Sequence, residues 1–198
     1  MSDTQNTAAA MIGVLTAIAI ISGTALGFTD LLTRDRIEAN RIERRMAAVR
    51  AVLPEFANEP AAEEWSHPDL PAHLAFPGRN EQGDITGIAI QTRVSSGYGG
   101  NLTVVTGLTP DSVVTAVFVL QHAETPGLGA RITEQAFRDQ FAGINLSEQT
   151  PAVQQDGGSI DAVTAATLSS RAVAEAVDRA GQVLPEFLAA VESGGSDE

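Results

Sequence analysis

The hydroxyl groups between residues 161 and 170 are the side chains of this sequence best placed for chemistry. The segment reads DAVTAATLSS, in which Thr164 and Thr167 flank two alanines and two serines follow. No cysteine, histidine or lysine stands nearby to activate a hydroxyl as a nucleophile. The pattern that follows predicts a helix over about 169–191, whose first N–H groups and positive dipole end point back along the chain.

A helix start of this kind is a predicted site for an anion such as a phosphate. Ala165 and Ala166 carry only methyl groups, so a bulky phosphate or an approaching enzyme could reach the backbone and the Thr167 hydroxyl. Ser169 and Ser170 could cap the helix or donate to phosphate oxygens. The alternative is that the whole segment is a helix N-cap and nothing more.

Two glycine-rich segments are further candidates for binding. The first, ETPGLG at 124–129, places a carboxylate and a hydroxyl beside Gly127 and Gly129, which allow positive φ angles and the close approach of a flat ligand. A tight loop between a strand and a helix would have the same composition. The second, SGYGG at 96–100, lies between two predicted strands and indicates a hairpin or bulge, with Tyr98 as a surface or ligand contact.

The composition excludes several classes of function. The 198-residue chain has a net charge of −13, which would repel nucleic acid, so no nucleic-acid partner is expected. It has no cysteine, which excludes disulfides, thiolate catalysis, cysteine-ligated zinc and iron–sulfur clusters held by this chain. The three histidines are widely spaced, and His67 and His73 lie among prolines, so no metal site is expected.

The first part of the chain predicts a membrane anchor. No charged residue occurs over 4–29, and the apolar run 8–28 would span roughly 31 Å as a helix, close to the hydrocarbon thickness of a bilayer. A cleaved signal peptide is the alternative, but residues 1–7 carry Asp3 and no arginine. Arginines follow the anchor and none precedes it, so the positive-inside rule alone would keep the rest of the chain in the cytoplasm.

The remaining pattern predicts an α+β fold, in which one transmembrane helix is followed by a mostly antiparallel sheet packed with helices. Hydrophobic spacing favours a helix over 34–53 and a proline-rich loop over 55–80. Apolar runs predict strands at 84–93, 101–108 and 112–123, the last of them buried on both faces or central. A short helix with Thr133 as its N-cap is expected over 133–141, and the final helix should kink at Pro185.

Taken in order, these motifs resemble one family of bacterial flavoproteins. An N-terminal anchor, GY-x-G before an apolar strand, ETPGLG, and D-x-x-[ST]-[GA]-A-T before a C-terminal helix are similar to the FMN-binding subunits of two related complexes. These are the G subunit of the Rnf electron-transport complex and the C subunit of the sodium-translocating NADH:quinone oxidoreductase. The modest length of the chain is more similar to the Rnf protein.

The resemblance implies a specific cofactor site. FMN would be joined through its phosphate to Thr167 as a phosphoester, installed by a separate flavin transferase that takes FMN from FAD with a divalent metal. Asp161 and Thr164 would serve in recognition or shape the loop. The loop that lies against the flavin would contribute Glu124, Thr125, Gly127 and Leu128, and the helix start would contribute Ala165, Ala166, Leu168 and Ser169.

The same resemblance implies a role and a location. The chain would relay electrons among the other membrane subunits of an ion-translocating ferredoxin/NAD electron-transport complex, with no catalytic residue of its own. It would be a single-pass protein of the bacterial inner membrane, with its flavin domain on the periplasmic side despite the arginine count. The expected regions are a tail and anchor (1–33), a membrane-proximal helix and loop (34–80), an FMN-binding domain (81–192) and a disordered tail (193–198). A non-covalent FMN-binding or regulatory anchored module is the alternative.

One residue departs from the family pattern. The motif usually has glycine where this chain has Ala165. If that position requires a positive φ angle, alanine would be strained there by about 1 kcal/mol.

Overall fold

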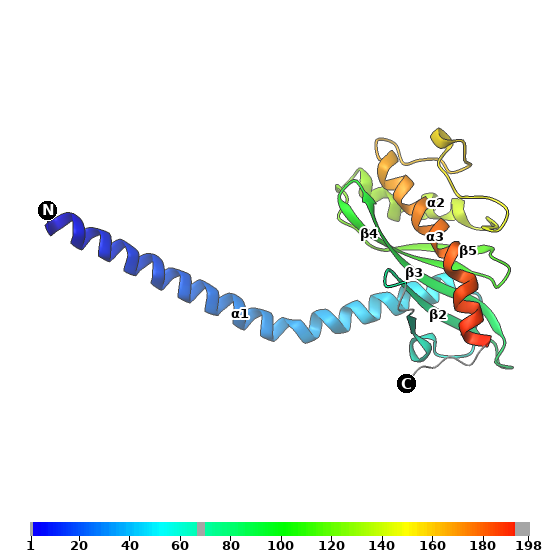
Figure 1. Cartoon of the computed structure of the whole chain (residues 1–198), viewed down its shortest axis with the longest axis horizontal. Coiled ribbons are helices and arrows are strands. Elements are labelled where there is room, and N and C mark those ends of the chain that lie inside the picture. The colour runs from blue at the N-terminus through cyan, green and yellow to red at the C-terminus, as the bar shows by residue number, and fades with distance from the viewer. Residues whose placement is uncertain (1, 67–69, 193–198) are drawn as a thin grey trace. The chain divides into compact units, whose positions relative to one another are not determined.

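The structure is a computed structural model that describes residues 2–66 and 70–192, so the predicted tail 193–198 and His67 lie outside the described residues. The chain forms two compact units, residues 1–43 and 44–198. Helix α1 (Ser2–Val52) makes up the described part of the first unit, and its last turns belong to the second (Figure 1).

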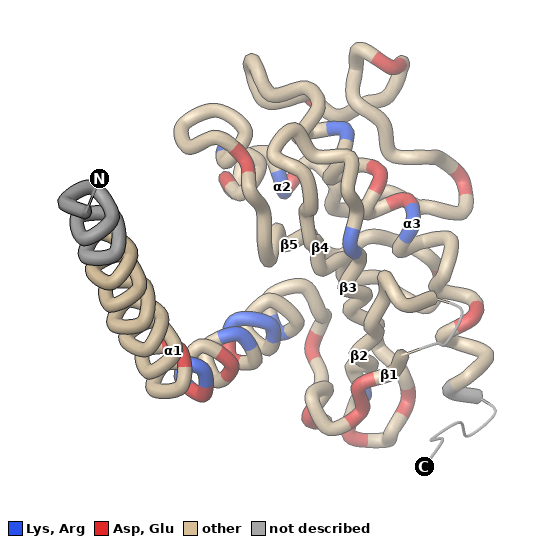
Figure 2. Tube along the Cα trace, turned by 60° about the vertical axis from the view of Figure 1, so that its left-hand side comes forward, with Lys and Arg blue, Asp and Glu red and all other residues tan. Residues whose placement is uncertain are grey.

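The first unit is a single apolar helix. Its large hydrophobic side chains are exposed from Met11 to Leu32. Figure 2 shows that the described part of this stretch carries no charge until acidic and basic residues begin to alternate, first with the ion pair between Arg34 and Asp30 at 2.6 Å. Among the described residues, α1 is the one helix long and apolar enough to cross a membrane. The predicted anchor is therefore confirmed as a helix that could span a bilayer.

The second unit is built on one five-stranded antiparallel sheet. The strands are β1 (Trp65–Ser66), β2 (His73–Arg79), β3 (Ile85–Gly97), β4 (Gly100–Leu108) and β5 (Val114–Gln121), and they lie side by side in chain order. The three strands predicted after residue 84 are confirmed, and so is the hairpin at SGYGG, where Gly97 pairs with Gly100. The α+β class is confirmed as well.

One prediction about the sheet is wrong. The segment 55–80 is not all loop, because β2 pairs with β3 from His73↔Thr92 to Arg79↔Ile85. For the apolar strand near 112–123, two alternatives were open, and the strand is not central, because β5 pairs with β4 alone. The other alternative, packing on both faces, agrees with the structure. Val117 and Val119 join the core on one face, while Phe118 packs against the core on the other.

Each face of the sheet is covered by a helix, which follows from the period-two alternation of strand residues. Ile88 and Ile90 of β3 pack with α3 (Thr167–Glu192), whose apolar side includes Val173 and Val177. The intervening Ala89 faces the opposite side. There it packs with the end of α1 in a cluster whose buried members are Ala48, Val49, Val52, Leu53, Phe76, Ala89 and Val105. The end of α1 is thus part of the folded domain.

Short helices fill the connection between the sheet and α3. They are the 3₁₀ helix Gly129–Thr133, α2 (Gln135–Arg138), and the 3₁₀ helices Asp139–Phe141 and Gln154–Asp156. Thr133 is not the N-cap of a helix over 133–141, because its hydroxyl donates to the Ala130 carbonyl at 2.8 Å and α2 begins two residues later. Pro185 lies inside α3, which begins at Thr167 rather than at 169.

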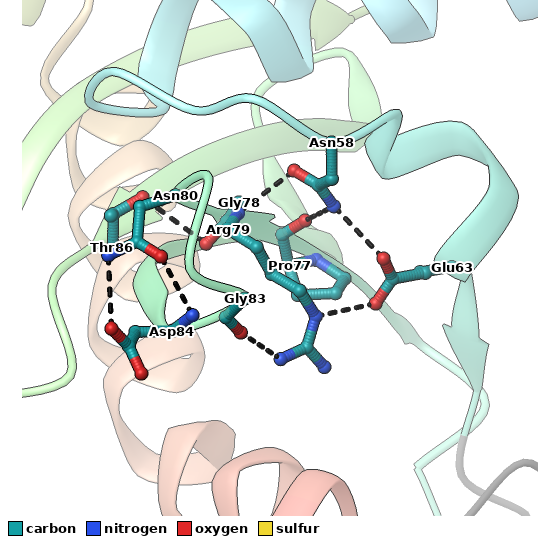
Figure 3. A network of polar contacts seen from close by, with 9 residues as sticks. All are labelled: Asn58, Glu63, Pro77, Gly78, Arg79, Asn80, Gly83, Asp84 and Thr86. Carbon is teal, nitrogen blue, oxygen red and sulfur yellow. Dashed lines mark hydrogen bonds and ion pairs between the residues drawn. The ribbon is translucent and has the colours of Figure 1, made fainter.

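A polar network fixes the segment that follows α1 (Figure 3). The 3₁₀ helix Pro60–Glu63 ends at Glu63, and the carboxylate of this residue accepts a hydrogen bond from Arg79 Nε at 2.9 Å. Asn58 accepts from the Arg79 backbone N–H at 2.9 Å and donates to the Pro77 carbonyl at 3.0 Å. Partial burial would raise the pKa of Glu63, but the hydrogen bonds from Arg79 and Asn58 outweigh it and hold that pKa below its usual value. The network attaches residues 58–63 to the outer side of β2.

The cluster at the end of α1 gives a test of this packing. Phe76→Ala should lower the free energy of unfolding by about 3–5 kcal/mol, because it removes a fully buried ring between α1 and the sheet. Urea denaturation of the detergent-solubilised full chain, followed by the fluorescence of Trp65, the single tryptophan, measures it. The exposed Leu128→Ala should change the same quantity by less than about 0.5 kcal/mol. Equal losses in the two variants would contradict this packing.

Candidate functional site

Three segments that are distant in sequence meet at one end of the sheet. They are the tip of the β3–β4 hairpin, the loop after β5, and the start of α3. The meeting follows from the strand register. Because β5 runs antiparallel to β4 and pairs Gln121 with Thr103, its last residue lies beside the first residues of β4, close to the hairpin tip. The loop that follows β5 must therefore start next to that tip.

These segments enclose a pocket of about 570 Å³. Its lining residues are Tyr98, Glu124, Thr125, Leu128, Gly129, Ala165, Ala166, Thr167, Leu168 and Ser169. Eight of the eleven residues predicted for the site line this pocket. The other three, Gly127, Asp161 and Thr164, are not among the lining residues.

The start of α3 leaves backbone donors free at the pocket wall. The first helical hydrogen bond joins the Ser170 N–H to the Ala166 carbonyl at 3.0 Å. Among the described residues, no partner accepts from the backbone N–H groups of residues 167–169. These donors and the positive end of the helix dipole favour a negatively charged ligand group at this point.

The hydroxyl groups around the helix start differ in availability. Ser169 Oγ donates to Glu124 Oε2 at 2.7 Å, and Ser170 Oγ donates to the Ala166 carbonyl at 3.0 Å while accepting from the Val163 N–H. Both serine side chains are buried. Thr167 is half-buried at the pocket, and its hydroxyl has no hydrogen-bond partner among the described residues. Of the hydroxyls that line the start of α3, that of Thr167 is the accessible one.

The arginine nearest the start of α3 is engaged elsewhere. Arg171 Nε and Nη2 donate to the two oxygens of Asp156 at 2.6 and 2.7 Å. These hydrogen bonds lower the pKa of Asp156, so the pair is ionised at neutral pH. The pair ties the 150–160 loop to the first turns of the helix. An anion at this helix start would therefore be held by backbone N–H groups and not by Arg171.

Ala165, which stands where the family motif usually has glycine, adopts the left-handed conformation. Its φ angle is +61°, one of two positive values among the described residues that are not glycine. The turn it occupies is closed by a hydrogen bond from the Ala166 N–H to the Val163 carbonyl at 2.9 Å. The strain predicted from the sequence therefore applies, at a cost of about 1–2 kcal/mol.

The three predicted residues outside the pocket lie on its approaches. Asp161 is exposed, and Gln140 holds its backbone by bonds of 2.6 Å to its N–H and 3.2 Å to its carbonyl. Thr164 is exposed in the turn before Ala165. Gly127 uses the freedom that glycine allows and has a φ angle of +76°, whereas Gly129 is not among the residues with positive φ.

Large apolar side chains form the exposed rim of the pocket. Tyr98, Leu128 and Leu168 are 72%, 48% and 50% exposed. Within the described part of the second unit, these are the only large hydrophobic residues that are exposed, and all three line this one pocket. A flat, partly apolar ligand would cover them. The resemblance did not assign Tyr98 or Gly129 to the cofactor site, but the sequence had marked Tyr98, between glycines at a hairpin, as a surface or ligand contact and Gly129 as a point of close approach for a flat ligand.

A smaller cavity of about 300 Å³ lies between β5 and α2. Its arginine, Arg138, lies over the Phe118 ring at 5.2 Å and donates to the Val117 carbonyl at 3.2 Å. None of the predicted site residues lines it. These contacts are consistent with a structural role for Arg138, which covers the outer edge of β5.

Comparisons with known proteins identify the domain in which this pocket lies. A family model described as the FMN-binding domain matches residues 97–182, which include all three pocket segments. The chain is similar to the G subunit of the ion-translocating oxidoreductase complex of Aliivibrio fischeri, with 33% identity over 84% of this chain and 85% of that protein. It is also 28% identical, over 86% of this chain and 88% of that protein, to the G subunit of the Na(+)-translocating ferredoxin:NAD(+) oxidoreductase complex of Acetobacterium woodii.

A solved structure shares the fold. The crystal structure of Shewanella oneidensis NqrC matches with a TM-score of 0.50 and 20% sequence identity, over 64% of this chain and 69% of that chain.

The strain at Ala165 leads to a stability prediction. Ala165→Gly should raise the free energy of unfolding by about 0.5–1 kcal/mol, because relief of the left-handed strain exceeds the extra entropy of glycine in the unfolded chain. The matched control is the buried neighbour Ala166→Gly, which should lower the stability. Thermal and urea unfolding of both variants without cofactor measure the difference. A loss of stability in Ala165→Gly equal to that of the control would show that the left-handed conformation is absent.

Proposed function

The chain belongs to the family of G subunits of ion-translocating oxidoreductase complexes, and from this premise we propose that it relays electrons through an FMN group joined covalently to Thr167. The relatives and the matched domain together show that the chain is an FMN-binding subunit of such a complex. The covalent link, the residue that carries it and the enzyme that forms it are the proposal.

One observation supports the proposal most strongly. The pocket combines an accessible threonine hydroxyl, unpaired backbone donors at a helix start, and an apolar rim. FMN needs the same combination, since it has a charged phosphate at one end and a flat, largely apolar ring system at the other. The residues present fit this cofactor. Thr167 and the N–H groups beside it would hold the phosphate, and Tyr98, Leu128 and Leu168 would contact the ring.

Attachment would be a phosphoryl transfer to Thr167. The Thr167 Oγ–P bond forms, the pyrophosphate bond of FAD breaks, AMP leaves, and the hydroxyl proton passes to a base on the transferase. The pocket lining supplies no histidine or lysine to take that proton, and the two oxygens of its one carboxylate, Glu124, already accept hydrogen bonds from Ser169 and Gly99. This supports assigning the chemistry to a separate enzyme. Asp161 and Thr164, exposed beside the helix start, are proposed to meet the transferase.

The domain then positions the flavin and sets its surroundings, while the bound flavin supplies the redox chemistry. A tethered cofactor stays with the protein when it is exposed to dilute surroundings, which is a physical reason for an ester bond. The partners would be the other membrane subunits of the complex. Non-covalent FMN binding is the second candidate, and the open rim of the pocket is the observation that favours it. Assignment to the sodium-translocating NADH:quinone oxidoreductase, as its C subunit, has less support, because that likeness shows only the fold.

We also propose that the flavin domain lies on the periplasmic side of the bacterial inner membrane. The uninterrupted helix α1 supports a retained anchor over a cleaved leader, because the helix continues without a break from the apolar run to Val52. Arg34, Arg36 and Arg41, which follow the apolar run, argue for the cytoplasmic side. Packing against other subunits is proposed to override this bias.

The attachment residue can be tested by mass spectrometry. In wild-type chain from cells that contain the transferase, the tryptic peptide 139–171 should carry the mass of one FMN less water. Thr167→Ala should abolish this increment, and Thr167→Ser should retain part of it because a hydroxyl remains. The matched control Thr164→Ala removes the neighbouring exposed threonine and should leave the increment on Thr167, although at a reduced level if the transferase contacts Thr164. An increment that persists in Thr167→Ala would locate the ester on another residue.

The proposed orientation can be tested because the chain has no cysteine. A single cysteine at the exposed residue Glu81 should react with a membrane-impermeant maleimide in cells whose outer membrane has been permeabilised. A cysteine in place of Ser2, before the apolar run, should stay unlabelled until the inner membrane is opened. The reverse pattern would place the flavin domain in the cytoplasm.

A further inference from the structure

We infer that Glu124 is a positioning residue, which shapes the pocket by joining the hairpin tip to the start of α3. The side chain is 6% exposed, although it comes from a surface loop. Its Oε2 accepts the hydrogen bond from Ser169 Oγ at 2.7 Å, and its Oε1 accepts from the backbone N–H of Gly99 at 3.3 Å. One carboxylate thus bonds to both of the other segments that form the pocket.

Two glycines leave room for this carboxylate. A Cβ atom on Gly97, in the hairpin, would lie 2.6 Å from Glu124 Oε1. A Cβ atom on Gly129, in the loop after β5, would lie 2.6 Å from Oε2 and 2.9 Å from Ser169 Oγ. These distances are shorter than those of real Cβ contacts, so a side chain at either glycine would require the Glu124 carboxylate to shift from its present position. The two glycine-rich motifs of the sequence, SGYGG and ETPGLG, therefore pack around the same buried carboxylate.

The charge of Glu124 is met without a cation. No arginine forms a salt bridge with it among the described residues. A buried carboxylate in this position depends on its hydrogen bonds and on the positive end of the α3 dipole, which it approaches through Ser169. Loss of these bonds would leave the hairpin tip and the helix start without their link through the loop.

This geometry distinguishes the positioning role of Glu124 from that of a residue that bonds to the flavin directly. Both of its oxygens are engaged within the protein, so its effect on a ligand would pass through Ser169 and Gly99. The chain offers a matched comparison, in which Ser96 of β3 donates to the carboxylate of Glu175 in α3. That pair also joins the hairpin strands to the final helix, but neither residue lines the pocket.

Hydrogen exchange of the full chain, made in cells without the transferase, tests the link before any flavin is attached. In Glu124→Ala the amides of residues 97–100 should exchange about tenfold to a hundredfold faster, as expected for loss of a hydrogen bond to a charged group. Glu124→Gln should restore slow exchange, because its amide oxygen can accept from Gly99 and its amide N–H₂ can donate to Ser169 Oγ. Glu175→Ala should leave the amides at the tip unchanged. If Glu124→Ala fails to fold, Ser169→Ala removes one of the two bonds and should speed exchange of the Ser170 amide, the first one bonded in α3.

A second arm measures attachment of the cofactor, and only this arm rests on the proposed function. With the transferase and FAD supplied, Glu124→Ala should take up FMN at least tenfold more slowly than wild type, and Glu124→Gln at a similar rate to wild type. The inference would be overturned if Glu124→Ala or Ser169→Ala showed the same hydrogen-exchange rates and the same rate of FMN attachment as the wild type. So would a Glu124→Gln variant as impaired as Glu124→Ala. If the wild type takes up no flavin but exchange responds as described, the proposed function fails and the positioning role of Glu124 stands.

Discussion

The structure depends on one constraint, which is that the first turn of α3 is left without a side-chain cap at the surface of the domain. Two serines are available to cap it, but Ser169 is bonded to Glu124 and Ser170 to the Ala166 carbonyl. The backbone N–H groups of residues 167–169 therefore face the pocket without a partner among the described residues. Unpaired donors at a helix start are costly unless water or an anion satisfies them. The strained Ala165 and the small Ala166 before them keep the approach open.

The sheet brings the other parts of the site to this helix start. Antiparallel pairing places the end of β5 beside the β3–β4 hairpin, and α3 crosses one face so that its first turn lies at the same end. Val49 and Val52 at the end of α1 cover the opposite face, where they pack in one cluster with Phe76 of β2. The last turns of α1 and the helix α3 that lines the pocket thus pack on opposite faces of one sheet, within one folded domain.

The sequence predicted the parts whose signals are local. Alternating apolar residues located β3 and β4, and the resemblance of the motifs to one family pointed to eight residues of the pocket. Strand β2 was missed because its sequence, HLAFPGR, contains alanine, proline and glycine, which are uncommon in strands. Pro77 is tolerated there because β1 is only two residues long and pairs with β2 at residues 74–75, so that β2 has an unpaired edge beyond that point. The position of β5 at the sheet edge was missed because two cores bury its two faces. The bond between Glu124 and Ser169 joins residues 45 positions apart, and no pattern within either motif could predict it.

The central claim is that a phosphoester at Thr167 holds the flavin. The most direct measurement is flavin fluorescence of the full-length chain in a denaturing gel, after the protein has been purified from cells that contain the transferase and boiled in detergent. The account predicts a fluorescent band at the mass of the chain, since only a covalent bond survives unfolding of the pocket. A dark band from protein that was yellow before boiling would contradict it and would leave a domain that binds FMN only while it is folded.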